Sequence, residues 1–495
     1  MGKALPLNLI KHGRLLLSKK PAQGFDLFSP LMEGFIEIIQ GFIEIGMKYF
    51  SSFMQTQVFK RKNSSHFKVD YEMLDSPKKV TDETDLGWSI NQKRPFRLDQ
   101  LKPHLHTFIV GASGWGKSNI LNLLMEANLQ SGRPIIFIDP KGSLSTLKEF
   151  QSLCKRYDKK PLIFSEHFIE VTKFNFFPSV NSTQALLLLM RSFDWGEKPN
   201  QYYLKCGEEA LKKTLDKLYS LNCPFGLKEV FKDFKLFHDS PETKGLLTQL
   251  DLLVNSPFGH LFDTGPDIDP INFKKIREEG HCVYIGISTM GYGSLAKTIG
   301  KMFVSELQTL AHNIGIKYDT QEEAIKKSFG VFIDEAGSVL YPDFIDLANK
   351  ARSSGMNLTI AVQSYSDIEM ISKNETLMLQ LIECFSTWLI QKQTGQNAEK
   401  LSNLFGTFLS EKRTVMTEGG AVSDKGSLRD AHEFACHPDI LKSIKPGQSM
   451  LLTFHPKDIH LLNIRDSKMP RPEVVSSKPV EGKKFRNRFG GSNEG

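Results

Sequence analysis

Cysteine is scarce in this chain, and none of it is arranged to bind a metal. The 495 residues include six cysteines, and no two of them form a Cys-x-x-Cys pair or another zinc-type spacing. Scattered thiols of this kind are typical of a reduced, cytoplasmic protein. We therefore expect a cytoplasmic chain whose cysteines are reduced and mostly buried.

Long uncharged hydrophobic runs are also missing, because no stretch of 18 residues lacks a charged side chain. The strongest candidate, residues 31–50, carries a polar stripe at helical spacing, formed by Glu33, Glu37, Gln40, Glu44 and Lys48. Its carboxylates make a free-standing spanning helix marginal to unfavourable. The better interpretation is an amphipathic helix that lies on a membrane, on a partner or on its own domain, with a spanning helix as the remaining alternative. The segment also lacks the features of a signal peptide.

The charge balance is mildly basic, with a formal net charge of +7 and a pI near 8.8. Such a balance favours acidic partners, namely nucleic acid or an anionic membrane surface. The residues after about 467 are poor in large apolar side chains and rich in Lys, Arg, Gly and Pro. We therefore expect 467–495 to be a disordered basic tail.

The rest of the chain alternates strand-like and helix-like segments, with one interruption. Continuous apolar runs at 107–111 and 134–140 flank a helical pattern at 117–132, which favours a parallel sheet covered on both faces. Residues 181–270 are mostly helical in pattern, and strand-like runs return after them. The sequence therefore predicts an α/β domain at 67–180 and 271–466, interrupted by an all-α insertion domain at 181–270 and preceded by an N-terminal segment at 1–66.

A glycine-rich loop follows the first of these strands. Gly111-x4-Gly116-Lys117-Ser118 matches the phosphate-binding loop (P-loop), and it lies between a predicted strand and a predicted helix. In such a loop the backbone N–H groups turn towards the phosphates, the lysine neutralises the β and γ oxygens, and the serine hydroxyl ligates Mg²⁺. The predicted nucleotide-binding residues are Gly111, Ala112, Ser113, Gly114, Trp115, Gly116, Lys117, Ser118 and Asn119. Trp115 is unusual here, and it either stacks on the nucleotide or packs against the protein.

Two later strands end in polar residues that suit ATP hydrolysis. The run "VFIDEA" places Asp334 to hold Mg²⁺ and Glu335 to polarise the attacking water. The run "LTIAVQS" ends in Gln363, whose amide could sense the γ-phosphate. Arg352, eleven residues earlier, could reach the γ-phosphate of a neighbouring subunit in a ring. The chain has no Asn-Lys-x-Asp element, which argues against a GTPase.

These motifs occur in an order that resembles a known family. The segments "GASGWGKS", "FIDPKGSLSTL", "VFIDEAGSV" and "KARSSGMNLTIAVQSYSDI" are similar to those of the type IV secretion coupling proteins of conjugation systems, the TraD/TraG-like branch of the FtsK/HerA superfamily. The resemblance spans about residues 100–465. It implies a RecA-like ATPase domain with an all-α insertion, a homo-hexameric ring, ATP and Mg²⁺ as cofactors, and delivery of DNA to a membrane channel. It also implies a relaxosome and channel proteins as partners at the inner membrane.

Two departures from the family pattern bear on this interpretation. Ser143 stands where the family usually has an acidic residue, which weakens a role for that loop, and two clear transmembrane helices are missing at the start. The alternatives are therefore a cytoplasmic HerA/FtsK-type DNA motor, and a recruitment platform whose ATPase activity is secondary. In each case the expected site is the same, with Lys117, Glu335, Gln363 and Arg352 as catalytic residues and with Ser118 and Asp334 as metal ligands.

Overall fold

The computed structural model describes residues 69–467 apart from 80–81, 102–104, 169–170, 197–198, 266–267, 319–320, 373 and 419–420. These residues belong to one compact unit, His66–Gly495. The amphipathic stretch at 31–50 and the tail beyond residue 467 lie outside the described residues, so the interpretations of both stay predictions.

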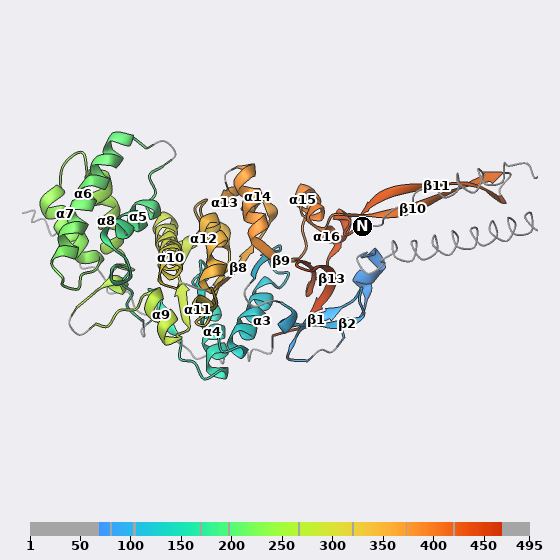
Figure 1. Cartoon of the computed structure of the whole chain (residues 1–495), viewed down its shortest axis with the longest axis horizontal. Coiled ribbons are helices and arrows are strands. Elements are labelled where there is room, and N and C mark those ends of the chain that lie inside the picture. Colours follow the sequence, from blue (N-terminus) through green and yellow to red (C-terminus); the bar gives the residue numbers. More distant parts are fainter. Residues whose placement is uncertain are drawn as a thin grey trace, which may run out of the picture. The chain divides into compact units, whose positions relative to one another are not determined.

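A large mixed sheet organises the described residues (Figure 1). It has eleven strands in the order β2-β1-β13-β12-β9-β3-β8-β7-β4-β6-β5. The strands are β1 (Asp85–Ser89), β2 (Arg94–Arg97), β3 (His106–Val110), β4 (Ile135–Asp139), β5 (Leu162–Phe164), β6 (Val283–Gly286), β7 (Phe329–Ile333), β8 (Met356–Val362), β9 (Phe385–Ile390), β12 (Gln448–Phe454) and β13 (Lys457–Ile464). The seven from β9 to β5 are parallel, and the other four extend the sheet with antiparallel pairings.

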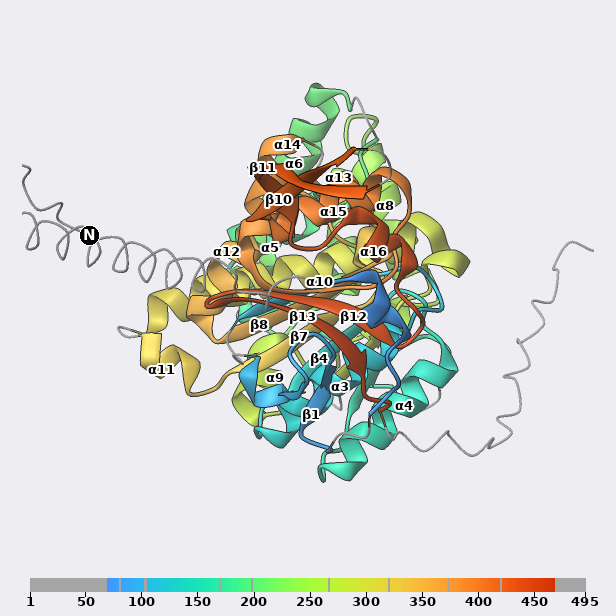
Figure 2. The same ribbon diagram turned by 90° about the vertical axis from the view of Figure 1, so that its right-hand side faces the viewer.

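Both faces of the parallel strands are covered by helices, as their continuous apolar runs predict. Every residue of β3, β4, β7 and β8 is buried. One face packs on α3 (Lys117–Gln130) and α4 (Leu144–Arg156), and the other packs on α10 (Thr289–Lys317), α12 (Phe344–Ala351) and α13 (Tyr365–Ser372). Figure 2 shows the sheet between these two groups of helices. The remaining helices around the sheet are α9 (Phe273–Glu279), α11 (Gln321–Ile325), α14 (Glu375–Cys384), α15 (Gly395–Phe405) and α16 (Pro438–Ser443).

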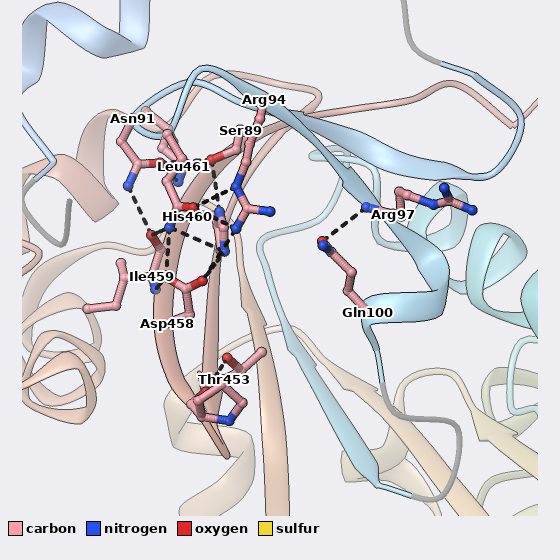
Figure 3. Close-up of polar contacts among 12 residues, drawn as sticks. Ser89, Asn91, Arg94, Arg97, Gln100, Thr453, Asp458, Ile459, His460 and Leu461 are labelled. Atoms are coloured by element: carbon pink, nitrogen blue, oxygen red, sulfur yellow. Dashed lines mark hydrogen bonds and ion pairs between the residues drawn. The ribbon is translucent and has the colours of Figure 1, made fainter.

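The antiparallel end of the sheet is fastened by a buried histidine (Figure 3). His460 on β13 is fully buried, with its Nδ1 2.8 Å from Ser89 Oγ and its Nε2 3.0 Å from a carboxylate oxygen of Asp458. Beside it, the Asn91 amide donates to the carbonyl of Ile459 at 2.9 Å. These contacts join the end of β1 and the turn after it to β13, and they fix the strands that precede the P-loop onto the last described strand.

Among the described residues, four α-helices in addition to α9 lie between β5 and β6 in sequence, although those strands are neighbours in the sheet. They are α5 (Ser182–Ser192), α6 (Gln201–Ser220), α7 (Leu227–His238) and α8 (Lys244–Val254). The segment 174–178 is core packing where this region begins, since Phe174, Phe176 and Phe177 are all buried. The two ends of the helical region meet, because Phe174 and Ile271 form a parallel bridge. The boundary predicted at 181–270 stays a prediction.

A separate two-stranded ribbon leaves the sheet after α15. It consists of β10 (Thr407–Glu418) and β11 (Ala421–Phe434), which pair with each other and with no other described strand. Figure 1 shows the ribbon beyond α15 and α16, the helices at its two ends. The backbone of the ribbon is described, but the side chains of 411–428 are not.

Candidate functional site: the carboxyl edge of the parallel strands

Loops from five neighbouring parallel strands meet at one edge of the sheet. The strands β9, β3, β8, β7 and β4 are adjacent in this order, so their carboxyl ends lie side by side. This is the edge at which open α/β sheets bind ligands. The structure places Lys117, Asp334, Glu335 and Gln363 here, from three different sequence motifs.

The P-loop joins β3 to α3 with the backbone that its glycines allow. Gly114 and Gly116 have φ angles of 81° and 99°, in the left-handed region that side chains with a Cβ rarely adopt. Lys117 is buried, and its ammonium donates to the carbonyl of Gly111 at 2.6 Å. Burial lowers the pKa of Lys117, while the Asp334 carboxylate acts to raise it. The cation is therefore held inside the loop and faces an acidic residue from the next motif.

A glutamine at the end of β9 supports the P-loop from below. Gln391 is buried, and its amide donates to the carbonyl of Trp115 at 2.6 Å. Its side chain fills the space beside Gly111, where an added Cβ would stand 2.4 Å from Gln391 Oε1. Gly111 is therefore required by the close approach of Gln391 and not by a left-handed backbone.

Trp115 packs on the protein in this structure, which is the second of the two roles weighed for it. Its indole N–H donates to the carbonyl of Ile444 at 3.0 Å, and the ammonium of Lys392 lies 4.8 Å from its ring centre. Asn119 is likewise engaged, because its side chain donates to the carbonyl of Arg465 and accepts from the N–H of Ser467, both at 2.7 Å. The predicted contact of Asn119 with the nucleotide would therefore be made by its backbone and not by its side chain.

The two acidic residues after β7 sit against a lysine. Asp334 is buried, whereas Glu335 is less so and has a left-handed φ of 42°. The ammonium of Lys141 lies 2.9 Å from Glu335 Oε1 and 3.8 Å from Asp334 Oδ2. Burial raises the pKa of Asp334, and Lys141 opposes this shift. Burial acts to lower the pKa of Lys141, but its hydrogen bond to Glu335 and the nearby carboxylates outweigh burial and raise it.

Gln363 points at the same carboxylate from β8. Its amide donates to Glu335 Oε1 at 3.1 Å. The loop that carries it is fixed because the backbone N–H groups of Gln363 and Ser364 both donate to Asp367 Oδ2, at 2.8 and 3.0 Å. Gln363 and Lys141 therefore hold Glu335 from two sides, in the position from which it would act on a water molecule.

The oxygen donors at this edge suit a hard cation held together with a phosphate. Ser118 is exposed at the start of α3, and the Asp334 carboxylate is close enough to Lys117 to raise the pKa of its ammonium, against the effect of burial. Among the described residues no group of three or more His, Cys, Asp or Glu side chains could hold a metal by itself. Magnesium in nucleotide sites commonly takes one or two protein ligands and completes its shell with phosphate and water. The residues present therefore fit Mg²⁺ bound with a nucleotide, which Ser113 and Gly114 at the exposed tip of the loop would also contact.

Ser143, the departure noted in the sequence, has a structural role. Its side chain caps α4 by accepting from the backbone N–H of Thr146 at 3.2 Å. The acidic group of this loop is Asp139 at the end of β4, which is buried and accepts from the Tyr284 hydroxyl at 2.7 Å. Asp139 also accepts from the backbone N–H of Lys141 at 2.9 Å. The loop is thus folded so that Lys141 reaches the carboxylates after β7.

Arg352 is not brought to this edge. It starts the short 3-10 helix Arg352–Ser354 just before β8, whereas Gln363 follows β8. The seven residues of that strand separate the two by about 20 Å at 3.3 Å per residue. Arg352 is exposed, and it lines a pocket of about 490 Å³ whose other cationic residues are Arg133, Arg277, Lys326 and Lys327.

His106 is structural, as expected of the "HLH" segment, while His104 lies outside the described residues. His106 is buried. Its Nε2–H donates to the carbonyl of Ala348 at 3.0 Å, and its Nδ1 accepts from the N–H of Leu358 at 3.1 Å, a pattern that requires the neutral imidazole. Burial lowers its pKa to about 4, and the nearby Arg352 acts in the same direction. His106 thereby fixes α12, which leads into Arg352, against β3 and β8.

Sequence reasoning missed Lys141 as a partner of the carboxylates and Gln391 as a support of the P-loop. The segment "WLIQKQ" carried the signal, because it is an apolar strand that ends in polar residues in the same way as "VFIDEA" and "LTIAVQ". Gln393 from this segment donates to the carbonyl of Gln363 at 3.1 Å. The rule that located Asp334 and Gln363 therefore also applied to β9.

Comparison with known proteins shows which fold this arrangement belongs to. Residues 328–434 match the family model described as the TraM recognition site of TraD and TraG. The bacterial conjugative coupling protein TrwBΔN70 superimposes with a TM-score of 0.60 at 17% identity, covering 82% of this chain and 93% of that chain. The chain has the fold of a conjugative coupling protein. The resemblance predicted from the sequence is confirmed, as is the α/β, RecA-like P-loop NTPase fold with its mostly parallel sheet.

Other matches agree with a coupling-protein fold. The structure of TrwB in complex with ADP and Mg²⁺ gives a TM-score of 0.58 at 17% identity, covering 82% of this chain and 95% of that one. VirB4 of Thermoanaerobacter pseudethanolicus gives 0.51 at 14% identity, covering 79% of this chain and 99% of that one. An uncharacterized protein of Mycoplasma pneumoniae is 29% identical over 72 residues, which are 14% of this chain and span only 58% of that protein. Within the part of the chain that the structure describes, no helix has the length and hydropathy needed to cross a bilayer.

Proposed function

We propose that this chain is an ATP-driven, DNA-translocating coupling protein that delivers DNA or nucleoprotein to a type IV secretion or conjugation channel. The observation that carries the proposal is the meeting of Lys117, Asp334, Glu335 and Gln363 at one edge of a coupling-protein fold. A site that only bound a metal ion, or that only sensed the γ-phosphate, would need fewer of these side chains. Together they supply a phosphate contact, a metal ligand, a base and a water-orienting amide.

The roles of the residues follow from their positions. Lys117 and the backbone N–H groups of residues 111–116 bind the ATP phosphates, and Ser118 and Asp334 hold Mg²⁺, the latter through water. Bound Mg²⁺ neutralises the charge that develops on the phosphates. Glu335 polarises the attacking water, and Gln363 orients it. Because Lys141 already contacts Glu335, we expect it to keep that carboxylate in place.

Arg352 completes the site of a neighbouring copy. An arginine some 20 Å away along β8 cannot reach the nucleotide of its own chain, but it faces outwards beside a cationic pocket. In a homo-hexameric ring, this surface of one copy would approach the P-loop edge of the next. Arg352 would then stabilise transition-state charge in trans.

The proposed partners are DNA, bound without sequence preference, and the proteins of a relaxosome and secretion channel. The basic balance of the chain suits phosphate contacts. The match of 328–434 to a TraM recognition model supports a relaxosome partner. We place the protein in the bacterial cytoplasm, with peripheral or partner-mediated association with the inner membrane.

ATPase assays test the proposal directly. Purified full chain should hydrolyse ATP faster with single-stranded or duplex DNA than without DNA, and Lys117→Ala should abolish hydrolysis in every condition. Lys155→Ala, at an exposed position of α4, is the matched control and should behave as the parent.

Hydrolysis that ignores DNA but responds to a protein substrate would contradict a DNA motor and favour the recruitment platform. Fractionation of cells that express the chain with and without residues 1–60 tests the membrane association separately. A fully cytosolic distribution of both forms would favour a HerA/FtsK-type motor.

A further inference from the structure

Two exposed lysines, Lys326 and Lys327, line the same pocket as Arg352. The pocket has a volume of about 490 Å³ and opens at the amino edge of the sheet, among the ends of α3 and α9 and the turns before β7 and β8. The ammonium of Lys327 donates to the carbonyl of Glu278 at 3.4 Å, a long hydrogen bond that leaves the side chain at the surface. Together with Arg352, this lysine pair places three exposed cations on one cavity.

The two arginines of the pocket are explained by the helices that end there. Arg277 is buried in the last turn of α9, and its guanidinium lies 5.6 Å from the ring centre of Tyr318. Arg133 follows the C-terminal end of α3. Cations at such a position offset the negative end of the helix dipole. The same account is much weaker for the lysine pair, because α11, which precedes it, has five residues, little more than one turn.

The pairing of β7 with β8 holds the lysine pair beside Arg352. The two strands are parallel, and their first residues, Phe329 and Met356, are partners in the sheet. Just before them, the N–H of Phe329 donates to the carbonyl of Gly355 at 3.0 Å. The turn that carries the lysine pair and the turn that carries Arg352 are therefore adjacent, and both precede a strand of the candidate site.

The same two strands carry candidate catalytic groups at their other ends. β7 leads from the lysine pair to Asp334 and Glu335, and β8 leads from Arg352 to Gln363. The five residues of β7 span about 17 Å at 3.3 Å per residue. The lysine pair is therefore out of reach of the nucleotide of its own chain, as Arg352 is.

The charges of the two edges are complementary once a nucleotide is bound. Five of the side chains that line the amino-edge pocket are cationic and two are acidic. At the carboxyl edge, Asp334 and Glu335 are already offset by Lys117 and Lys141, so the charge that a nucleotide adds there is that of its phosphates. In a ring that sets the amino edge of one copy against the carboxyl edge of the next, the pocket would face these phosphates.

We propose that the lysine pair of one copy binds the phosphates of the nucleotide held by the P-loop of the next copy, beside Arg352. The inference rests on the ring of the proposed function and deepens it by adding a binding part to the shared site. A lysine ammonium is a point charge on a flexible chain, whereas a guanidinium is a planar fork. The lysine pair therefore attracts the phosphates before and during the reaction alike, and Arg352 acts on the charge that develops in the transition state.

Steady-state kinetics of the full chain separate these two contributions. Lys326→Ala/Lys327→Ala should raise the KM for ATP about tenfold and leave kcat unchanged, because the change removes binding that substrate and transition state share. Arg352→Ala should instead lower kcat. The control is Lys155→Ala/Lys160→Ala, which removes two exposed lysines between α4 and β5, at the same edge but outside the pocket. The control should keep the KM of the parent.

A mixture of inactive chains shows which copy supplies the lysine pair. When Lys117→Ala chains are mixed with Arg352→Ala chains, hydrolysis is possible only where an intact P-loop of the second kind meets Arg352 of the first kind. Removing the lysine pair from the Lys117→Ala chain should raise the KM of the mixture about tenfold. Removing it from the Arg352→Ala chain should leave the KM unchanged.

An unchanged KM in both mixtures, or a rise only when the Arg352→Ala chain lacks the lysine pair, would overturn the inference, while the recovered activity would keep the trans role of Arg352. A lysine double variant that no longer assembles as the parent, in sedimentation velocity with an ATP analogue and Mg²⁺, would also overturn it and would assign the pair to a protein contact. A mixture without any recovery would overturn this inference and the trans role of Arg352 together. The DNA-stimulated ATPase of the parent, and its loss in Lys117→Ala, test the proposed function separately.

Discussion

The two edges of the parallel sheet differ in how completely their functional side chains are engaged. At the carboxyl edge, Lys141 and Gln363 both contact Glu335, and Lys117 is enclosed by its own loop. At the amino edge, Arg352 is exposed beside a cationic pocket, and the residue beneath it, His106, is occupied with backbone groups. The proposed nucleotide site lies at one edge, whereas the exposed guanidinium of Arg352 lies at the other.

Under the proposed function, this difference means that a single chain holds two incomplete halves of one reaction site. Gln363 directly follows β8, and Arg352 lies shortly before the same strand. The strand therefore fixes the distance between these two residues. Only association of two copies can bring an amino edge to a carboxyl edge. The following predictions either separate the two edges or test what holds each in place.

The largest effect is expected from mixing variants of the two edges. Arg352→Ala should lower ATPase activity about 10³-fold, because an arginine that reaches the transferred phosphate contributes this much in related chemistry. Lys117→Ala should be inactive as well. A mixture of the two inactive variants should recover activity, because a Lys117→Ala copy supplies Arg352 to an intact P-loop of its neighbour. Steady-state hydrolysis by the mixture is the measurement.

The control for this mixture is the double variant Lys117→Ala/Arg352→Ala mixed with either single variant. With Arg352→Ala it provides no arginine, and with Lys117→Ala it provides no P-loop lysine, so neither mixture should recover. Recovery in these mixtures, or none in the first, would contradict a shared site.

The next effect concerns the stability of the amino edge. The folded-state pKa of His106 is about 4, and its unfolded value is about 6.5. The folded chain therefore binds fewer protons than the unfolded chain between these values, so the contribution of His106 is complete above pH 6.5 and is lost as the pH falls towards 4. The loss amounts to about 3 kcal/mol in the free energy of unfolding. Urea titrations at pH 7 and pH 4.5 measure it.

His106→Asn should be less stable than the parent at pH 7 and should lose less stability on acidification. NMR titration of the His106 imidazole in the parent chain provides a second measurement that does not depend on the variant. An imidazole that titrates near 6.5 would contradict the buried, neutral state.

The smallest effect is expected at the carboxyl edge, from Lys141→Met. The change removes the 2.9 Å contact to Glu335 but leaves Gln363 in place, so we expect about a tenfold loss of hydrolysis, or about 1.4 kcal/mol. Removing the cation should also raise the pKa of Asp334 further, so that Mg²⁺ binding weakens at low pH. ATPase rates as a function of pH and Mg²⁺ concentration test both effects. Lys155→Met, at an exposed position of α4, should match the parent at every pH.

The sequence predicted those parts of the fold that depend on local residue patterns. Continuous apolar strands predicted the parallel sheet, and the P-loop pattern was enough to place the turn between β3 and α3. The antiparallel strands β1, β2 and β13 were missed, because β1 and β2 are short and all three contain polar residues. Their pairing depends on contacts such as Ser89 with His460, whose residues are 371 positions apart.

The candidate site could also be predicted only where a residue's own position in a motif indicates its role. A strand that ends in a carboxylate or an amide can be read directly, so Asp334, Glu335 and Gln363 were found. The contacts of Lys141 and Gln391 could not be read, because each depends on which strands are neighbours. Arg352 was assigned from its spacing alone, and the structure adds that it lies at the opposite edge from Gln363.

The packing of Trp115 in the P-loop gives the protein an internal optical reporter. Its indole hydrogen-bonds to Ile444, and Lys392 lies over its ring, so its surroundings are fixed while the loop keeps this conformation. The emission of an indole depends on the polarity and charge near its ring. Movement of the loop around a bound triphosphate would shift that emission, so occupancy and turnover could be followed by light without attaching a dye.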